Sequence, residues 1–149
     1  MGAVGLIARS AANVGDALRG VSRNMRYHTP GARLTMIDDE RPGYVQMRYD
    51  MLLGPGIPRR QAVELSYAVA LGFLRLVTGA DTSDWVVGFR HAAGLSPARY
   101  RKALGCRVLL GQDVDKLVFP TGLLASQIDS GSVELQRAAS RNRACTSRT

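Results

Sequence analysis

The chain has 149 residues, of which 46% are hydrophobic and 21% are charged, and its formal net charge is +8. This length predicts one domain with one hydrophobic core, and the apolar content excludes a wholly disordered chain. The longest apolar stretch, residues 65–74, falls well short of the ~20 residues of a membrane-spanning helix, so we expect no membrane anchor.

The positive charge is dispersed along the sequence, which is typical of a solvated surface. A small basic module that binds nucleic acid directly through its arginines remains the alternative.

The two cysteines, Cys106 and Cys145, lie far apart, which favours a reducing cytoplasm over a disulfide framework. Arg9 interrupts the apolar start after a run too short for a signal peptide, so we expect a cytoplasmic protein.

The first predicted helix begins after Asn13, whose side chain can accept a hydrogen bond from the amides of the first turn. Apolar residues then recur at intervals of three and four as far as Met25. Pro30 and Gly31 cannot continue the helix, so it should end close to residues 27–28.

Residues 33–51 predict a β-hairpin with one apolar face. In the first arm Leu34 and Met36 point one way, while the residues between them point the other way. A turn at residues 39–43 reverses the chain. In the second arm, residues 45–51, apolar and polar positions alternate again, so both arms should be half-buried strands.

A long helix is predicted over residues 59–77, with Gly79 at its end. Its apolar positions leave almost no polar face, which is typical of a helix buried on several sides. Glu64, close to its start, allows two interpretations: the carboxylate points to solvent, where the helix dipole favours it, or it faces a cavity.

After this helix, a core strand is predicted from the alternation of Trp85, Val87 and Phe89. Ser96 is the expected N-cap of a short helix with Pro97 at its first position. Gly105 fits the C-terminal end of that helix.

Two last strands are expected at residues 106–110 and 116–119, paired with each other across a polar turn. The order of elements contains hairpins but no repeating strand–helix–strand unit. The sequence therefore predicts an α+β fold with a largely antiparallel sheet packed against a central buried helix, together with additional short helices.

No strong catalytic signature is present. His28 and His91 are not spaced as metal ligands, and a triad assembled from Ser96, His91 and Asp84 lacks the Gly-x-Ser-x-Gly elbow. Cys106 has no evident partner base and is expected to be a small buried residue. The glycines form no phosphate-binding pattern, so we expect no enzyme, no cofactor and no metal.

The second half of the chain carries a spaced pattern of aromatic and glycine landmarks: F-x-H, then Tyr, then L/F-G-x-x-V, then G-x-x-x-N-x-L-x-F. The residues that match it are Phe89, His91, Tyr100, Leu104 and Phe119. With residues 5–7 and the helix near residues 17–19, this pattern resembles the N-terminal effector domain of AraC-type transcription regulators, the arabinose-binding-like branch. Asp115 stands where the family usually has asparagine.

The resemblance implies an effector-binding and dimerisation domain over residues 5–125, present in part, and a linker remnant with a disordered basic tail over residues 126–149. Relatives continue into two helix-turn-helix units that read DNA. The thirty residues after Phe119 are too few for even one unit, so we expect a truncated form that cannot bind DNA by itself. The expected partners are an unknown small-molecule effector and a second subunit, in a homodimer or in a heterodimer with a full-length regulator. A non-functional gene remnant is a further alternative.

A ligand pocket of such a domain should lie between the sheet and the long helix. Five residues are candidates to supply its polar groups: Tyr49, Tyr67, Trp85, His91 and Tyr100. Each of them is alternatively a core residue. For His91 the structural alternative is a hydrogen bond to a loop carbonyl that fixes the turn after the strand.

Overall fold

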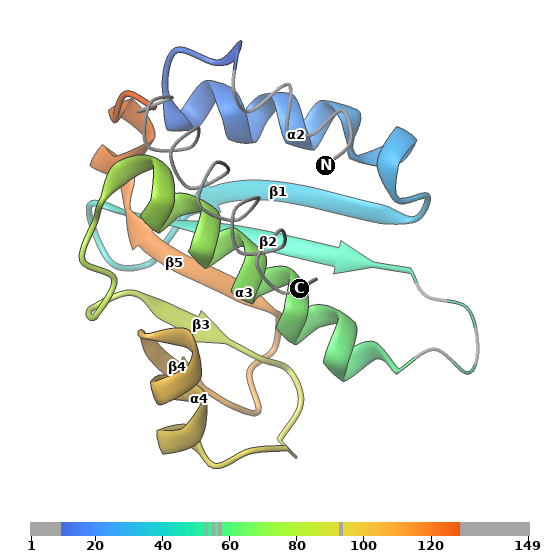
Figure 1. The fold of residues 1–149 in the computed structure, drawn as a ribbon. Helices are drawn as coiled ribbons and strands as arrows, with labels where there is room; N and C mark the ends of the chain where they lie inside the picture. Colours follow the sequence, from blue (N-terminus) through green and yellow to red (C-terminus); the bar gives the residue numbers. More distant parts are fainter. Residues whose placement is uncertain (1–9, 53, 55, 57, 93, 129–149) are drawn as a thin grey trace, which may run out of the picture.

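The computed structural model of the chain describes residues 10–52, 54, 56, 58–92 and 94–128. Its elements in chain order are α2 (Val14–His28), β1 (Ala32–Asp38), β2 (Tyr44–Met51), α3 (Arg59–Thr78), β3 (Val86–Gly88), α4 (Pro97–Leu104), β4 (Arg107–Leu109), β5 (Lys116–Pro120) and the 3-10 helix η1 (Thr121–Ala125). In Figure 1 α3 crosses in front of the sheet and α2 runs along β1. This arrangement confirms the predicted α+β class.

The strands form one sheet in the order β1-β2-β5-β3-β4. The pairs β1–β2, β2–β5 and β5–β3 are antiparallel, so the prediction of a largely antiparallel sheet is confirmed. The expectation that the last two strands form a pair is wrong, because β4 pairs with β3 and runs parallel to it. Helix α4 returns the chain to the end where β3 began, as parallel neighbours require, so β3-α4-β4 is a strand–helix–strand unit that the sequence analysis missed.

The hairpin β1–β2 has the predicted apolar face. Met36 stands opposite Met47 and Leu34 opposite Tyr49, so these four side chains share the face of the sheet that α3 covers. Phe119 continues this face in β5, where its side chain is fully buried. The short strand β3 supplies Val87, and Trp85 and Phe89 at its two ends are also buried, as the alternation predicted.

Helix α3 is buried on one side only, and the expectation of burial on several sides is wrong. The buried residues recur every three or four positions: Val63, Tyr67, Leu71, Leu74 and Val77. On the opposite side Leu65 is 66% exposed and Val69 is 62% exposed. An apolar sequence gives no direct measure of how many sides of a helix are covered, because solvent-facing positions also tolerate apolar residues.

The predicted helix ends are confirmed. Asn13 Oδ1 accepts a hydrogen bond from the Asp16 amide at 2.8 Å, and the Ser96 side chain accepts one from the Arg99 amide. Gly79 and Gly105 end their helices with φ of 65° and 68°, a left-handed conformation that glycine adopts without steric strain.

Arg75 joins the C-terminal ends of the two helices α3 and α4. Its Nε donates to Thr82 Oγ1 at 2.9 Å and its Nη2 donates to the Leu104 carbonyl, while Thr82 Oγ1 donates to the Gly105 carbonyl. These bonds fix the short β3-α4-β4 unit against the main helix.

Beyond the predicted boundary at residue 125, the chain docks against the start of α2. The Val14 amide donates to the Ser126 carbonyl at 3.0 Å, and Asn13 forms a β-bridge with Gln127. Residues 5–7 and most of the expected linker remnant and basic tail, residues 129–149, lie outside the described residues. None of the described helices combines the length and the apolar character needed to cross a bilayer.

Candidate functional site

Three of the five predicted pocket residues gather around the ring of Phe89. The ring centres of His91, Tyr100 and Tyr67 lie 4.9, 5.7 and 5.9 Å from it. Tyr67 and Tyr100 are almost completely buried and His91 is partly buried. We call Phe89, Tyr67, His91 and Tyr100 the aromatic cluster.

The two remaining candidates lie outside this cluster. The Tyr49 amide donates to the Tyr67 hydroxyl at 3.1 Å, so Tyr49 is connected to the cluster through its backbone. Trp85 packs against Phe119, with ring centres 5.5 Å apart, and is 2% exposed. The structure therefore unites three of the five residues and leaves Trp85 in a separate part of the core.

Glu64 supplies the charge of the aromatic cluster. Its Oε1 accepts a hydrogen bond from the Tyr100 hydroxyl at 2.5 Å and lies 3.2 Å from His91 Nε2. Arg60 Nε approaches the same oxygen to 3.8 Å. Of the two sequence interpretations, these contacts favour the inward direction, because the carboxylate meets Tyr100 and His91. His91 Nε2 thus meets a carboxylate of α3.

Both phenols of the cluster are held in the neutral form. Burial raises the pKa of Tyr100, and the hydrogen bond that its hydroxyl donates to Glu64 raises the pKa further. Burial also raises the pKa of Tyr67 far above its ordinary value. The neutral Tyr100 hydroxyl donates to Glu64 and so joins α4 to the first turns of α3, whereas the Tyr67 hydroxyl accepts from the Tyr49 amide and joins α3 to β2.

Asp115 is a second fixing point beside the cluster. Its carboxylate accepts a hydrogen bond from the Arg90 amide at 2.9 Å and lies 3.6 Å from Arg59, although the side chain is only 5% exposed. Arg59 in turn donates to the Met51 carbonyl at 2.6 Å. A carboxylate at this position thus accepts the backbone hydrogen bond that an asparagine oxygen could also accept.

Cys106 is a buried free thiol with 1% exposure, as the sequence predicted. Burial raises the pKa of this thiol, which disfavours the nucleophilic thiolate. Within the described part of the chain, no group of three His, Cys, Asp or Glu side chains could hold a metal ion.

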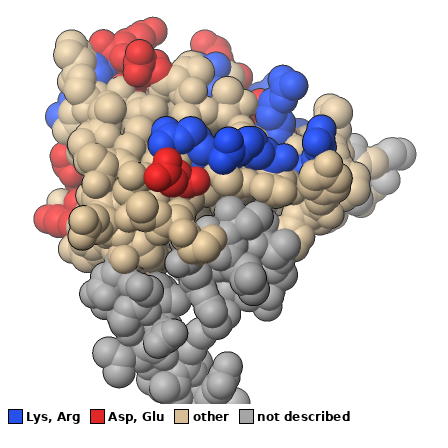
Figure 2. Space-filling view, turned by 90° about the horizontal axis from the view of Figure 1, so that it is seen from above, with Lys and Arg blue, Asp and Glu red and all other residues tan. Residues whose placement is uncertain are grey.

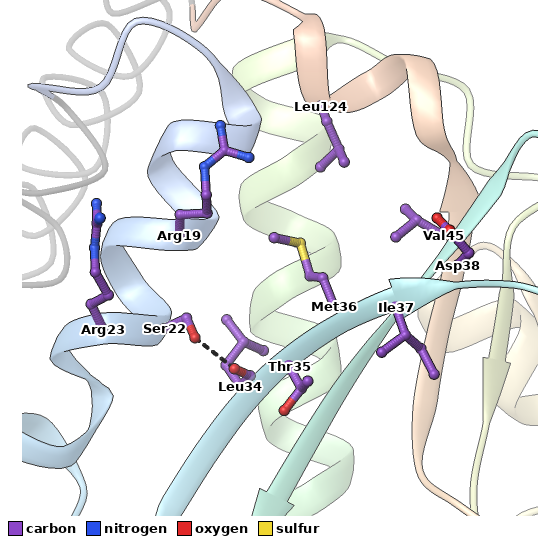
Figure 3. Close-up of a pocket in the computed structure, with 10 residues that line it drawn as sticks. All are labelled: Arg19, Ser22, Arg23, Leu34, Thr35, Met36, Ile37, Asp38, Val45 and Leu124. Atoms are coloured by element: carbon purple, nitrogen blue, oxygen red, sulfur yellow. Dashed lines mark hydrogen bonds between the residues drawn. The ribbon is translucent and has the colours of Figure 1, made fainter.

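An open groove of about 510 Å³ lies between α2 and β1, away from the aromatic cluster (Figure 3). Leu34, Met36, Val45 and Leu124 supply apolar atoms. The other described lining residues are Arg19, Ser22, Arg23, Thr35, Ile37 and Asp38. None of the five sequence-predicted residues is among them. Figure 2, which looks down on the α2 side, shows a row of basic side chains with acidic side chains beside it.

The groove follows the outer edge of β1, which pairs with no other strand of the described residues; we call it the free edge. The Gly31 carbonyl accepts from the Leu52 amide and the Asp39 amide donates to the Tyr44 carbonyl, with an unbroken register between these two pairs. Odd-numbered residues of β1 therefore direct their backbone groups toward β2, and the even-numbered residues direct theirs outward. Ser22 Oγ of α2 donates to one of these outward groups, the Leu34 carbonyl, at 2.6 Å.

Sequence reasoning missed this groove for a physical reason. Its walls come from a helix and a strand whose relative placement depends on the strand order of the whole sheet. The one available signal was Ser22 and the arginines of α2, polar residues that the helical pattern assigns to its outer side.

Comparison with known proteins gives the family. Residues 1–128 match the family described as the arabinose-binding domain of AraC transcription regulators, N-terminal. The HTH-type transcriptional regulator VirS from two strains of Mycobacterium tuberculosis is 34% identical over 142 residues, which cover 95% of this chain and 42% of VirS. The chain thus spans less than half the length of these curated relatives.

A solved structure supports the same fold. The crystal structure of the transcriptional regulator CdpR from Pseudomonas aeruginosa matches with a TM-score of 0.69 at 18% identity, over 88% of this chain and 43% of CdpR. The match over residues 1–128, the VirS relatives and this shared fold agree with the aromatic and glycine landmarks of the sequence. The chain belongs to the family of N-terminal arabinose-binding domains of AraC transcription regulators.

Proposed function

We propose that this domain senses a small-molecule effector for an AraC-type regulator and that the effector binds in the groove between α2 and β1. The observation that carries the proposal is the composition of the groove: an apolar floor with Arg19, Arg23 and Asp38 at its rim. Ligand sites of soluble proteins typically combine apolar walls with a few polar groups that fix orientation.

The aromatic cluster is the alternative location, because the sequence-predicted residues Tyr67, His91 and Tyr100 meet there. Its rings fill the space around Phe89, and Glu64 already interacts with both Tyr100 and His91. A ligand would have to displace these contacts. The groove requires no such displacement, which favours it.

Regulation requires that the effector bind one conformation of the regulator better than another. In this proposal the domain works in the cytoplasm, either as a homodimer or in a heterodimer with a full-length regulator, and it reads DNA only through an attached helix-turn-helix half. As predicted from the sequence, the chain alone would then not bind an operator. Co-purification with a full-length regulator supports the heterodimer, and a strictly monomeric chain without such a partner contradicts both assemblies.

A thermal-shift screen tests the effector proposal. The purified chain is melted with pentoses, hydroxy acids, amino acids, aromatic acids and short peptides, and at least one class should raise Tm through binding to the folded state. The variant Ser22→Trp places a large side chain between α2 and β1, where the Ser22 side chain points, and it should abolish the shift. Ser66→Trp is the matched control, because Ser66 is also a half-buried helical serine whose hydroxyl donates to a backbone carbonyl, and it does not line the groove.

Two outcomes contradict the proposal. A ligand whose shift persists in Ser22→Trp but is lost in Tyr67→Phe or His91→Gln moves the effector site to the aromatic cluster. Tight binding of DNA by the chain alone, falling steeply with salt, supports the basic nucleic-acid module instead.

A further inference from the structure

We propose that the ligand of the groove between α2 and β1 is a short extended peptide that carries a carboxylate and pairs with the free edge of β1. The inference rests on the proposed role of the groove and specifies the chemistry of its ligand. It follows from three properties of the groove: its backbone edge, its charge and its dimensions.

Along half of the groove, the outward backbone groups of β1 are available to pair with another strand. Met36 and Asp38 direct their amides and carbonyls outward, and within the described part of the chain these groups make no hydrogen bond. The Leu34 amide points the same way, while the Leu34 carbonyl is taken by Ser22. A peptide backbone presents donors and acceptors at the matching spacing, which is the basis of recognition by strand addition.

The outward backbone groups of this edge favour a peptide over an anion with a purely apolar chain, such as a fatty acid. An acyl chain lying over Met36 and Asp38 would remove their backbone groups from water without offering partners, at a cost of roughly five- to hundredfold in affinity for each group. A peptide satisfies the same groups while its alternate side chains contact the apolar floor. The observations therefore favour the peptide.

Charge favours an acidic group on the ligand beside Arg23, whereas the lining carboxylate of Asp38 lies at the other end of the β1 segment (Figure 3). Arg23 is exposed and makes no ion pair with any described residue, whereas Arg19 pairs with Asp16 at 2.7 Å. A carboxylate on the ligand would give Arg23 a partner and the fork geometry of arginine suits it. The chain's own C-terminal residues 137–148 carry four arginines and no acidic residue, so their charge disfavours them as the occupant.

The dimensions limit the ligand to a single short strand. The outward groups extend from Leu34 to Asp38, five residues that span ~13 Å of strand. Helix α2 lies against this edge through the bond between Ser22 and Leu34. A second copy of the domain would bring its own α2 against the same edge, so one isolated strand of about five residues fits better.

Five probes test the inference by calorimetric titration of the whole chain. They are acetyl-Val-Glu-Val-Glu-Val-amide, its lysine counterpart, sodium decanoate, and a pair of acidic peptides that are N-methylated at one or the other alternate set of amides. We expect the acidic peptide to bind, with the lysine peptide about tenfold weaker or more because it meets Arg23. One of the two N-methylated peptides should lose binding and the other should keep it, since only one set of amides can face β1.

Variants of α2 test the charge without touching the strand. Arg23→Glu should weaken the acidic peptide by about tenfold or more and strengthen the lysine peptide. Arg26→Glu is the matched control on the same helix, because Arg26 does not line the groove, and its effect should stay below about threefold.

Each remaining outcome overturns part of the account. If decanoate binds at the groove and neither charged peptide does, the peptide inference fails and the effector role of the groove stands. Equal binding of the two N-methylated peptides overturns strand pairing. If thermal-shift ligands bind only elsewhere in the molecule, the effector role of the groove and the peptide inference both fail.

Discussion

The aromatic cluster and the groove between α2 and β1 differ in how completely their polar groups are satisfied. In the cluster, Glu64 accepts a hydrogen bond from Tyr100 and contacts His91, and the rings pack around Phe89. In the groove, the outward backbone groups of Met36 and Asp38 have no partner in the described part of the chain. Satisfied buried groups stabilise a fold, whereas open ones at a concave surface are available to a ligand.

The largest expected effect is on the stability of the cluster. Phe89→Ala removes a fully buried ring and should lower the free energy of unfolding by about 3–5 kcal/mol. At the groove, Ile37→Ala removes a 39% exposed side chain and should cost about 1 kcal/mol or less. Urea unfolding followed by circular dichroism measures both. Equal losses would contradict the assignment of stability to the cluster.

A smaller effect is expected from a single hydroxyl of the cluster. Tyr100→Phe leaves Glu64 without its hydrogen-bond donor and should lower the free energy of unfolding by about 1–3 kcal/mol. Tyr44→Phe is the control, because its hydroxyl contacts Asp84 at 3.3 Å in an exposed position. The same urea titration compares them, and a loss for Tyr44→Phe as large as for Tyr100→Phe would show that the cluster hydrogen bond has no special weight.

The two phenols also predict a pH dependence. Their pKa values are raised in the folded state above the ordinary value of 10.0, chiefly by burial. The contribution of the two neutral phenols to the free energy of unfolding is therefore fully present below about pH 10. It is lost as the pH rises through their folded-state pKa values. Urea midpoints measured from about pH 8 to about pH 11 should fall in the upper part of this range. This decrease of the urea midpoint with pH should be smaller in Tyr100→Phe, which lacks one of the two phenols. A decrease as large as in the unmodified chain would contradict a contribution of Tyr100 to the pH dependence.

The smallest effect on stability is expected at the groove rim. Arg23→Gln changes an exposed side chain without an ion pair among the described residues, so the free energy of unfolding should change by less than about 0.5 kcal/mol. Thermal and urea unfolding measure this change. A large loss would mean that Arg23 supports the fold, and the groove would then lose its interpretation as a surface kept free for a ligand.

Local sequence signals predicted the local structure well. Asn13, Ser96 and Gly105 act through hydrogen bonds or dihedral angles within a few residues, and all three take the predicted positions at helix ends. The alternation in β1 and β2 likewise fixed which residues share a face, because a strand has a period of two.

Long-range arrangement was harder to predict. The parallel pairing of β4 with β3 depends on the path of α4. The one-sided burial of α3 depends on which side of the helix the other elements cover, and they leave Leu65 and Val69 exposed. The aromatic cluster was anticipated in part through Tyr67, His91 and Tyr100, while the direction of Glu64 was left open between solvent and a cavity. The groove was missed because the free edge of β1 exists only once the strand order is known.

The most direct test of the central claim is a two-dimensional amide NMR spectrum of the chain, titrated with each compound that raises Tm in the thermal-shift screen. The account predicts that the perturbed signals belong to Leu34–Asp38 of β1 and to Arg19–Arg23 of α2, which line the groove. Perturbations confined to Glu64, His91 and Tyr100 would contradict it and place the effector in the aromatic cluster.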